Sequence, residues 1–392
     1  MGATREGIRA WQGPAVLTYG FRPFFLLAAV WAALAVPVWV ASFTLGDGTI
    51  GGTDGRLWHT HEMLFGYGGG VIAGFLLTAV PNWTGRLPVS GWPLAGLVGL
   101  WLLGRIAGFL PPAAGPAAPV ADVSFLIVFA ALIWREILAA GNRRNLPVAL
   151  MVTLLACANI AFHASAQWPE AGPHSERVAV AVITALIALI GGRIIPSFTQ
   201  NWVLPRGLPR PTPFGLFDKI ALVVTVGSLA LWVAMPQAVA TGAALLAAGG
   251  LSLVRLLRWR GWTTWPESMV WILHLGFAWL PVGFLLLGAS ALAPGAVPFT
   301  AGVHALTAGG IGVMTLAVMT RATRGHTGRP RASDLATTTI YGLVLAAAAV
   351  RVLAPFLPDL TATLLATSAG LWVFAFAGFS AVYGPMLLRK SL

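Results

Sequence analysis

The chain has 392 residues, of which 57% are hydrophobic and only 9% are charged. Water-soluble domains carry about 25% charged residues, so this composition excludes a soluble globular protein. The net charge of +12 does not indicate a nucleic-acid partner, because the basic residues stand in short clusters between long apolar runs. We therefore expect an all-α protein embedded in a lipid bilayer, with residues 1–392 forming a single integral-membrane domain.

Apolar stretches long enough to cross a bilayer recur along the whole chain. A transmembrane helix needs about 20 mostly apolar residues, and glycine, proline and charged residues mark the breaks between such stretches. The predicted fold is a polytopic helical bundle of about 12 transmembrane helices. The predicted spans are 22–43, 59–82, 93–111, 121–139, 147–168, 178–200, 217–235, 238–257, 268–289, 297–320, 336–355 and 361–387.

The loop charges predict which ends of the spans face the cytoplasm. Loops that stay in the cytoplasm are rich in Lys and Arg. If both termini are cytoplasmic, Arg105 and Arg193 lie within spans and almost all other basic residues fall in cytoplasmic segments. The exceptions, predicted to lie on the outside, are Arg56, Arg177 and Arg351. This asymmetry predicts that the N- and C-termini are both cytoplasmic.

An internal similarity links the second and tenth predicted spans. When the two are aligned, His61 falls on His304, and the Thr-Gly-Arg sequence at 84–86 falls on the same three residues at 327–329. The sixth span shares less of the pattern but runs in the same direction across the membrane. Equivalent helices at these positions favour three four-helix repeats, although glycine-rich helices also resemble one another by composition alone.

Four histidines gather near the outer ends of the predicted spans: His59, His61, His163 and His304. Ionisable residues in a bilayer are costly, by about 2.5 to 3.5 kcal/mol for a central Arg, Lys or Asp, so each needs a partner or a function. Imidazole nitrogen is a general ligand for iron and copper, which makes these four residues the candidate metal ligands. The alternative for each histidine alone is an interfacial residue that forms ordinary hydrogen bonds.

His59 and His61 cannot bind the same metal ion on a regular helix. They are two residues apart, so their side chains project roughly 200° from each other. We place His59 on the same side as Glu62 and a line of small residues, and His61 on the opposite side over Phe65. The small residues predict a close contact with another helix. They are Gly66, Gly70 and Gly74.

Two arginines within spans leave alternatives open. Arg105 is near the outer leaflet, where its partner is either Glu62 or a carboxylate of a ligand. Arg193 follows two glycines and precedes Pro196. This pattern favours either an interrupted sixth helix that presents backbone groups to a ligand, or an arginine that extends towards the cytoplasmic surface.

Four stretches of the chain carry a recognisable pattern. They are Gly-Phe-Arg-Pro-Phe-Phe at 20–25, Trp-His-Thr-His-Glu-Met at 58–63 with its continuation at 74–85, Gly-Gly-Arg-Ile-Ile-Pro-Ser-Phe-Thr at 191–199, and residues 304–328. In this order, and spread over nearly the whole chain, they resemble the NnrS family. The resemblance implies a haem- and copper-containing protein of the bacterial inner membrane, associated with the response to nitric oxide, denitrification and resistance to nitrosative stress. It assigns no ligand residues.

A non-covalent haem b is the cofactor that we predict on this basis. The chain carries a single cysteine, Cys157, and no Cys-x-x-Cys-His motif for covalent attachment of haem. Haem iron is commonly held by imidazole. Because His61 and His304 have equivalent positions and similar depth, we predict that they are the axial ligands of one haem near the outer face.

The haem prediction leaves roles for other polar residues. The propionates of a buried haem need partners, and the candidates are the basic residues predicted outside: Arg56, Arg177 and Arg351. His59 is left to bind copper or to cap the start of its helix, with His163 as the alternative copper ligand. Nitric oxide or a related small molecule is the expected partner.

Two other functions compete with a haem protein of the nitric oxide response. Twelve spans, cytoplasmic termini and an interrupted sixth helix also suit a secondary transporter. Twelve helices in three repeats suit a haem-copper reductase-like enzyme, by analogy of fold alone. A centre with two haems and copper needs about six imidazoles. The histidines in or beside predicted spans are His59, His61, His163, His274 and His304, and His274 lies near the inner end of its span, in the opposite leaflet. One haem with a separate copper is therefore favoured, and whether the protein is an enzyme stays open.

Overall fold

The computed structural model describes residues 11–391, and these residues are almost entirely helical. The strands within the described residues are the short β1 (Thr49–Ile50) and β2 (Thr53–Asp54), which pair antiparallel in a turn after the first long helix. The all-α prediction is confirmed. The predicted cytoplasmic N-terminus, residues 1–10, lies outside the described residues.

Eleven helical segments within the described residues are long and apolar enough to cross a membrane, and each corresponds to one predicted span. The remaining predicted span, 93–111, is the shorter apolar helix α5 (Trp92–Ala107). It ends earlier than predicted because the chain turns at Gly108 and Pro111-Pro112 cannot continue a helix. The protein is therefore a multi-pass membrane protein.

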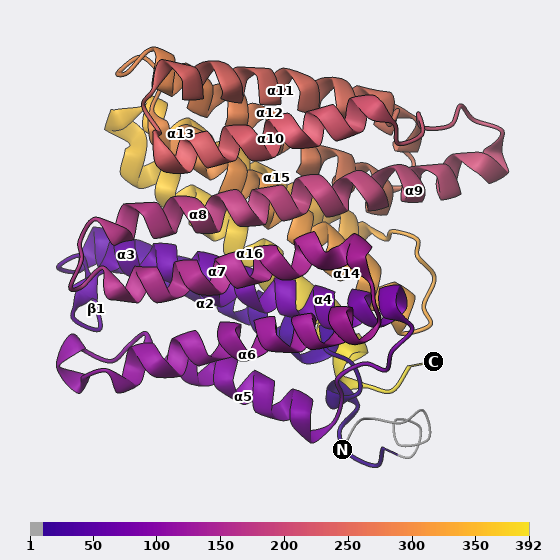
Figure 1. The fold of residues 1–392 in the computed structure, drawn as a ribbon, viewed down its shortest axis with the longest axis horizontal. Helices are drawn as coiled ribbons and strands as arrows, with labels where there is room; N and C mark the ends of the chain where they lie inside the picture. Colours follow the sequence, from indigo (N-terminus) through magenta and orange to yellow (C-terminus); the bar gives the residue numbers. More distant parts are fainter. Residues whose placement is uncertain (1–10, 392) are drawn as a thin grey trace. The chain divides into compact units, whose positions relative to one another are not determined.

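Several spans are built from more than one helical element (Figure 1). The other α-helices and the three π-helices are α2 (Phe21–Leu45), α3 (Gly55–His61), η2 (Glu62–Gly68), α4 (Gly69–Thr84), α6 (Ala117–Ala139), α7 (Leu146–Ala164), α8 (Ala171–Leu186), η5 (Ile187–Gly191), α9 (Gly192–Val203), α10 (Leu216–Ala234), α11 (Val239–Arg258), α12 (Ser268–Leu292), α13 (Phe299–His304), η8 (Ala305–Val313), α14 (Met314–His326), α15 (Leu335–Leu353) and α16 (Thr361–Leu388). Short 3₁₀ turns are η1 (Ala15–Leu17), η3 (Pro112–Ala114), η4 (Arg143–Asn145), η6 (Leu204–Arg206), η7 (Gly261–Thr264), η9 (Ala354–Phe356) and η10 (Pro358–Leu360).

Local sequence explains several helix ends. Asp54, Glu267 and Asp334 cap α3, α12 and α15, each with a carboxylate that accepts a backbone N–H, at 3.0, 3.1 and 2.8 Å. Such caps satisfy amide groups that have no partner within the helix. At the other end of the second span, Gly85 adopts a left-handed φ of 70° and stops α4. The cap at Asp54 is also where the chain enters the span that carries His59 and His61.

The chain forms two compact units. The described residues of unit 1 fall within Met1–Ala179, Ala322–Pro330 and Phe376–Leu392, and those of unit 2 within Val180–Arg321 and Arg331–Ala375. Each unit has its own set of packed helices and is described separately below. The single integral-membrane domain expected from the sequence stays a prediction.

In unit 1, α6 packs between α5 and α7, and α2 packs against α4 and η2. Figure 1 shows α5, α6 and α7 beside one another. The predicted glycine line on the second span lies in this packing: a Cβ atom at Gly74 would be 2.8 Å from the Phe25 ring, and one at Gly70 would be 3.0 Å from Trp101 Nε1. The predicted close helix contact is therefore confirmed, because neither position has room for a larger side chain.

Arg22 joins the beginning of α2 to the end of α16 within unit 1. Its guanidinium is buried, and Nη1 donates to the carbonyl oxygens of Leu387 at 2.9 Å and Arg389 at 2.6 Å, while Nη2 donates to Ser391 Oγ at 2.9 Å. The last carbonyl groups of a helix have no partner within it. Arg22 supplies those partners, so this arginine is structural.

Helix α12 is at the centre of unit 2, where it packs against α11, α13, η8 and α15. Glycines bring these helices together. A Cβ atom at Gly288 of α12 would lie 2.9 Å from the carbonyl oxygen of Gly242 on α11, and one at Gly276 would lie 3.2 Å from the backbone nitrogen of Met314 on α14. The backbones therefore approach closely, which is common where membrane helices pack through small residues.

The three π-helices of the described residues lie in the second, sixth and tenth spans. η2 begins directly after His61, and η8 begins directly after His304. This agreement supports the three predicted repeats, since the alignment of the second and tenth spans places the two histidines on each other. In the sixth span, η5 continues directly into α9, so of the two alternatives at Arg193 the interrupted helix is not the one found: a π-helical turn adds a residue without breaking the helix.

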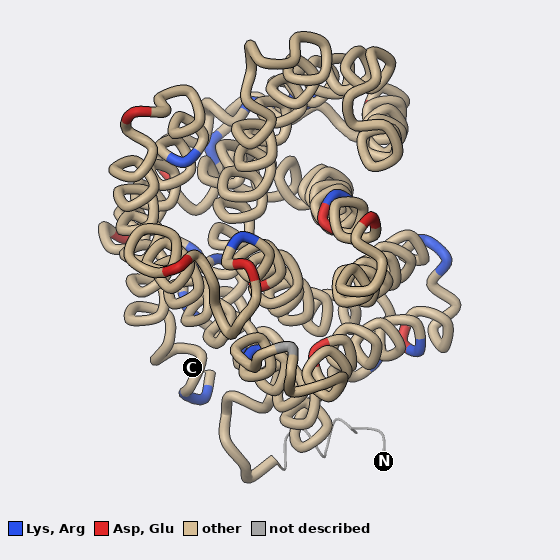
Figure 2. Tube along the Cα trace, turned by 90° about the vertical axis from the view of Figure 1, so that its left-hand side faces the viewer, with Lys and Arg blue, Asp and Glu red and all other residues tan. Residues whose placement is uncertain are grey.

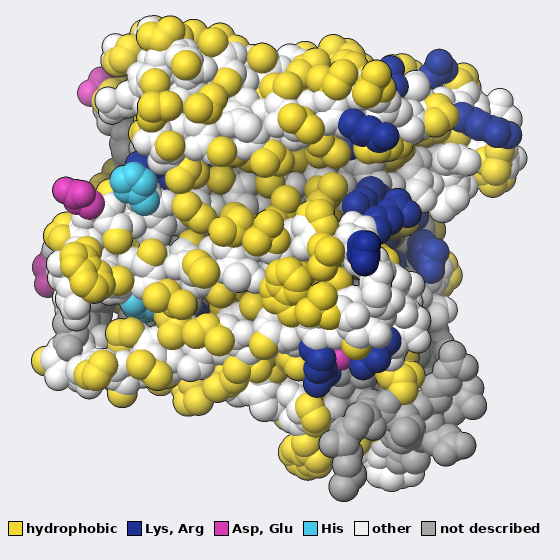
Figure 3. Space-filling view, viewed as in Figure 1, with side chains coloured by type: hydrophobic (Ala, Val, Ile, Leu, Met, Phe, Trp, Pro, Cys, Tyr) yellow, Lys and Arg dark blue, Asp and Glu magenta, His cyan; other side chains and the backbone are white. Residues whose placement is uncertain are grey.

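Charged residues are few along the helices, as the mostly tan trace of Figure 2 shows. In unit 2, Lys and Arg side chains gather over one end of α9, α10 and α11, at the right of Figure 3, while hydrophobic side chains cover the length of these helices. An apolar belt that ends in a group of basic side chains is typical of helices that span a membrane with their basic ends in the cytoplasm.

Candidate metal centre

A group of polar side chains is buried among four spans of unit 1. His61 is the last residue of α3 and Glu62 the first of η2. Arg105 comes from the last turn of α5 and Asp122 from the first turns of α6. His163 is at the end of α7, one helical turn after Asn159. The same packing of α5, α6 and α7 that forms unit 1 therefore brings these residues together.

Asp122 is at the centre of the group. Its Oδ2 atom accepts hydrogen bonds from His61 Nε2 at 2.9 Å, from His163 Nε2 at 2.9 Å and from Asn159 Nδ2 at 2.8 Å. His61 Nε2 also lies 3.1 Å from Asn159 Oδ1. One ligand atom from each of His61, Asp122 and His163 lies within 4.8 Å of the other two. We call these three residues the His61–Asp122–His163 cluster.

Glu62 and Arg105 surround the cluster with charge. His61 Nδ1 donates to Glu62 Oε1 at 2.9 Å. The Arg105 guanidinium donates one nitrogen to Glu62 and another to Asp122, so it bridges the two carboxylates. Two carboxylates and one guanidinium leave a net single negative charge. One further positive charge, carried by a proton on His61 or by a bound cation, balances the group.

Three glycines make room for these charged side chains. A Cβ atom at Gly66 would lie 2.2 Å from Arg105 Nη1, one at Gly104 would lie 2.6 Å from Asp122 Oδ1, and one at Gly108 would lie 2.9 Å from Glu62 Oε1. Any other residue at these positions would displace a member of the ion-pair network. Gly66, predicted from the sequence to lie in a close helix contact, does so against α5: it accommodates the guanidinium of Arg105, and its carbonyl oxygen accepts from Trp101 Nε1 at 2.9 Å.

The group is shielded from water except on one side. Glu62 is fully buried, and Asp122, Arg105 and His61 are each at most 5% exposed. The rings of Phe65 and Phe162 lie 5.3 Å and 5.1 Å from the His61 ring. The His163 side chain, in contrast, is 24% exposed. A small ion or molecule would therefore reach the cluster past His163.

Two imidazole nitrogens and a carboxylate oxygen are a donor set that suits first-row transition metals. A metal-bound histidine usually donates its other ring N–H to a carboxylate, which fixes the orientation and the tautomer of the ring. Glu62 is placed to accept such a bond from His61 Nδ1. The residues present thus fit a metal ion held by His61, His163 and Asp122 and oriented by Glu62.

The predicted histidines are separated as the helical spacing requires. The His59 ring stacks on Trp39 of α2 at 4.2 Å, away from the cluster that His61 joins. The Glu62 carboxylate lies on the predicted glycine side, since a Cβ atom at Gly66 would be 2.9 Å from Glu62 Oε2, and it also bonds to the adjacent His61. His61 and His163 are brought together by α3 and α7.

His304 lies in unit 2, whereas His61 lies in unit 1. The Nδ1–H of His304 donates to the carbonyl oxygen of Thr300 at 2.7 Å, which leaves Nε2 as the ring nitrogen with the lone pair. That tautomer suits a haem or metal ligand. The pairing of His304 with His61 on one haem stays a prediction.

The arginines predicted to bind haem propionates are in different places. Arg56 forms an exposed ion pair with Glu176, at 3.2 Å, in unit 1. Arg177 also belongs to unit 1, in α8, and Arg351 belongs to unit 2, near the end of α15. Their role towards a haem stays a prediction.

Sequence reasoning missed Asp122 and Asn159. A signal for Asp122 was present, because it is an acidic residue at the outer end of an apolar span, at the same depth as Arg105. Asn159 precedes His163 by four residues, so both lie on one face of α7. Of the two partners that the sequence left open for Arg105, Glu62 or a ligand carboxylate, the structure has Glu62, and it adds Asp122 as a second partner.

Comparison with known proteins gives one result over nearly the whole chain. A family model described as NnrS protein matches residues 15–391. No curated protein matches the chain. The matched range includes every residue of the buried group, so the cluster belongs to the part of the chain that the family describes.

Proposed function

We propose that this protein, which belongs to the NnrS family, binds haem b non-covalently and a transition-metal ion, with copper as the first candidate, in the bacterial inner membrane. Membership of the family supports a membrane protein of the nitric oxide response. The proposed role is to bind nitric oxide or to relieve nitrosative damage during denitrification. The observation that carries the metal part is the buried His61–Asp122–His163 cluster.

The metal assignment follows from the unfavourable free energy of burying this charged cluster in a bilayer without a metal. Charged groups inside a bilayer are unfavourable unless they are paired or have a function. Glu62 and Asp122 outnumber Arg105, so a positive charge is needed on or between the histidines. A metal ion bound by the two Nε2 atoms and Asp122 Oδ2 supplies that charge and uses donor atoms that already converge. The partly exposed His163 gives the ion an entry route.

The haem assignment depends on His304 and His61. The hydrogen bond from His304 to Thr300 prepares Nε2 for iron. His61 Nε2 is bonded to Asp122, so it would have to give up this bond to bind haem iron. When bound, haem iron would supply a site for nitric oxide wherever an axial ligand is weak or displaceable. Separate variants of the two histidines distinguish the haem ligand from the ligand of the second metal.

The experiment measures metal content and absorption spectra of the detergent-purified protein, oxidised and dithionite-reduced. The unmodified protein is expected to show a Soret band and about one equivalent of a second metal. Asp122→Asn and His163→Ala should lose the second metal while retaining the Soret band, because both residues belong to the cluster alone. His174→Ala is the matched control, since His174 is exposed and bonds only to the carbonyl oxygen of Glu170 in its own turn.

The same preparation tests the haem ligands. His304→Ala is expected to lose haem or to change its reduced spectrum, and His61→Ala to change both the haem spectrum and the metal content. A protein that binds no second metal in any preparation contradicts the metal part of the proposal. Unchanged spectra in both histidine variants contradict the haem part, and His59 with His163 becomes the next pair to test.

A secondary transporter is the second candidate, and one observation favours it. Buried groups of Asp, Glu and His in membrane helices also serve as proton relays in transporters, and Glu62, His61 and Asp122 form a continuous hydrogen-bonded chain. A colourless, metal-free protein that moves a solute across reconstituted vesicles would favour the transporter over the haem protein.

A further inference from the structure

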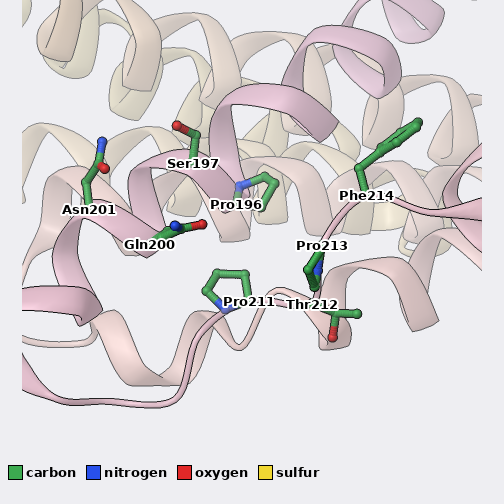
Figure 4. Close-up of a pocket in the computed structure, with 8 residues that line it drawn as sticks. All are labelled: Pro196, Ser197, Gln200, Asn201, Pro211, Thr212, Pro213 and Phe214. Atoms are coloured by element: carbon green, nitrogen blue, oxygen red, sulfur yellow. The ribbon is translucent and has the colours of Figure 1, made fainter.

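A polar pocket of about 360 Å³ lies in unit 2, between α9 and the loop that precedes α10 (Figure 4). Its helix wall carries Ser197, Gln200 and Asn201, and its loop wall is residues 211–214. Figure 4 shows Gln200 extending into the space between the helix and the loop prolines. Pockets that bind small ligands have volumes of about 300 to 1,000 Å³. The pocket is therefore large enough for a small polar group.

The loop wall is held in place by backbone and charged contacts. Thr212 N donates to a carbonyl oxygen at the end of α11 at 3.0 Å. Gly215 N donates to Asp218 Oδ2 at 3.0 Å, and Asp218 accepts from the buried Arg255 at 3.0 Å. Arg255 also donates to the carbonyl oxygen of Ala188 in η5, at 2.9 Å. One buried ion pair thus anchors both the loop and the span that forms the opposite wall, so the pocket is formed before a ligand arrives.

The pocket lies where two spans end. α9 ends at Val203 and α10 begins at Leu216, so the pocket is at the depth of the lipid headgroups. Its rim is apolar on one side: Phe214 is 54% exposed and Leu216 is 73% exposed. Basic residues flank the walls in the sequence, although none lines the pocket itself: Arg206 follows α9, and Arg210 and Lys219 stand on either side of the loop wall. Arg258, at the end of α11, supplies the carbonyl oxygen that accepts from Thr212 N.

We propose that this pocket binds the headgroup of an anionic glycerolipid whose phosphate carries a hydroxylated substituent. The amides of Gln200 and Asn201 and the hydroxyls of Ser197 and Thr212 donate and accept hydrogen bonds, as a polyol requires. The neighbouring arginines suit the phosphate, and the exposed apolar rim suits the acyl chains. The proposal depends neither on the haem nor on the His61–Asp122–His163 cluster.

A phosphorylated polyol in solution has the same headgroup chemistry but no acyl chains, so the test separates the two sources. Delipidated protein in a neutral detergent is titrated with dioctanoyl phosphatidylglycerol, dioctanoyl phosphatidylcholine or glycerol 3-phosphate, and its melting temperature is followed. Phosphatidylglycerol is expected to raise the melting temperature saturably, and the other two compounds are not. An equal effect of phosphatidylcholine overturns the headgroup assignment. An equal effect of glycerol 3-phosphate overturns the lipid as the source.

A variant tests whether phosphatidylglycerol raises the melting temperature by binding in this pocket. Gln200→Leu removes an amide from the pocket without changing charge, and the phosphatidylglycerol concentration for half-maximal effect should rise about tenfold, which is about 1.4 kcal/mol. Gln237→Leu is the matched control, because Gln237 is exposed between α10 and α11 and does not line the pocket. An unchanged response of Gln200→Leu overturns the site. If that variant does not fold, native mass spectrometry of the unmodified protein decides: no preference for retained phosphatidylglycerol over phosphatidylcholine overturns the proposal.

Discussion

Arg105 shows how one side chain organises a polar site in an apolar environment. It bridges Glu62 and Asp122, and both carboxylates also bond to His61. A buried ion pair contributes little net stability when it is intact, because burying the charges costs about as much as their attraction returns. Removing one partner is different, since it leaves uncompensated charge. The loss of Arg105 should therefore destabilise the fold.

We expect Arg105→Met to lower the free energy of unfolding by about 3 to 5 kcal/mol, because two carboxylates would stay buried without their cation. The measurement is denaturant unfolding in detergent micelles. Arg56→Met is the control: its ion pair with Glu176 is at the surface, where the Arg56 side chain is 62% exposed, and its loss should change stability by at most about 1 kcal/mol. The double variant Arg105→Met with Glu62→Gln should recover part of the loss. Equal stability of Arg105→Met and the unmodified protein contradicts this account.

The geometry of the buried polar group depends on how closely the helices around it approach one another. α5 and α6 pack side by side, and Gly104 of α5 faces Asp122 of α6. His61 and Glu62, at the junction of α3 and η2, bond to each other, and they bond to Asp122 and Arg105 respectively. The glycine pattern of the second span predicted a tight contact from the sequence. The sequence did not predict that the glycines would accommodate charged side chains, because the partner helix was unknown.

Gly104→Ala should destabilise the protein by about 1 to 3 kcal/mol and lower its metal content, since overpacking a tight contact forces its neighbours to move. The new Cβ would lie 2.6 Å from Asp122 Oδ1 and 3.1 Å from Asp122 Cα, which is backbone and cannot rotate away. Gly96→Ala on the same helix is the matched control. No atom lies within 4 Å of a Cβ atom at Gly96, so stability should rise by up to about 1 kcal/mol. The same response at both positions would mean that α5 and α6 are not this close.

For the whole molecule, composition predicts the spans, and loop charge predicts their orientation across the membrane. Apolar runs predicted the eleven long spans of the described residues and the shorter apolar helix α5, because the bilayer requires long segments whose backbone groups are satisfied internally. The distribution of Lys and Arg predicts that both termini are cytoplasmic. This orientation is a property of the chain in a membrane, so it needs a measurement in intact cells.

We expect a cysteine at position 332, between α14 and α15, to resist an impermeant thiol reagent in intact spheroplasts and to react after permeabilisation. Ala332→Cys is made together with Cys157→Ser, so that the introduced thiol is the only one. Ala296→Cys, in the loop between α12 and α13, is the control and should react from outside. Both positions are exposed. Labelling of position 332 in intact spheroplasts would reverse the proposed orientation.

The sequence by itself determined the class of protein, the positions of the apolar helices, the opposite directions of His59 and His61, and the glycine face of the second span. These features depend on local composition and helical period, which act within one segment. Only the tertiary structure decided which histidine joins which acid. Asp122 comes from α6, whereas Asn159 and His163 come from α7, so their contact with His61 depends on how α6 and α7 pack against the second span. The local sequence of one segment does not determine which distant segment it packs against. The cluster could therefore be recognised only once the positions of the helices were known.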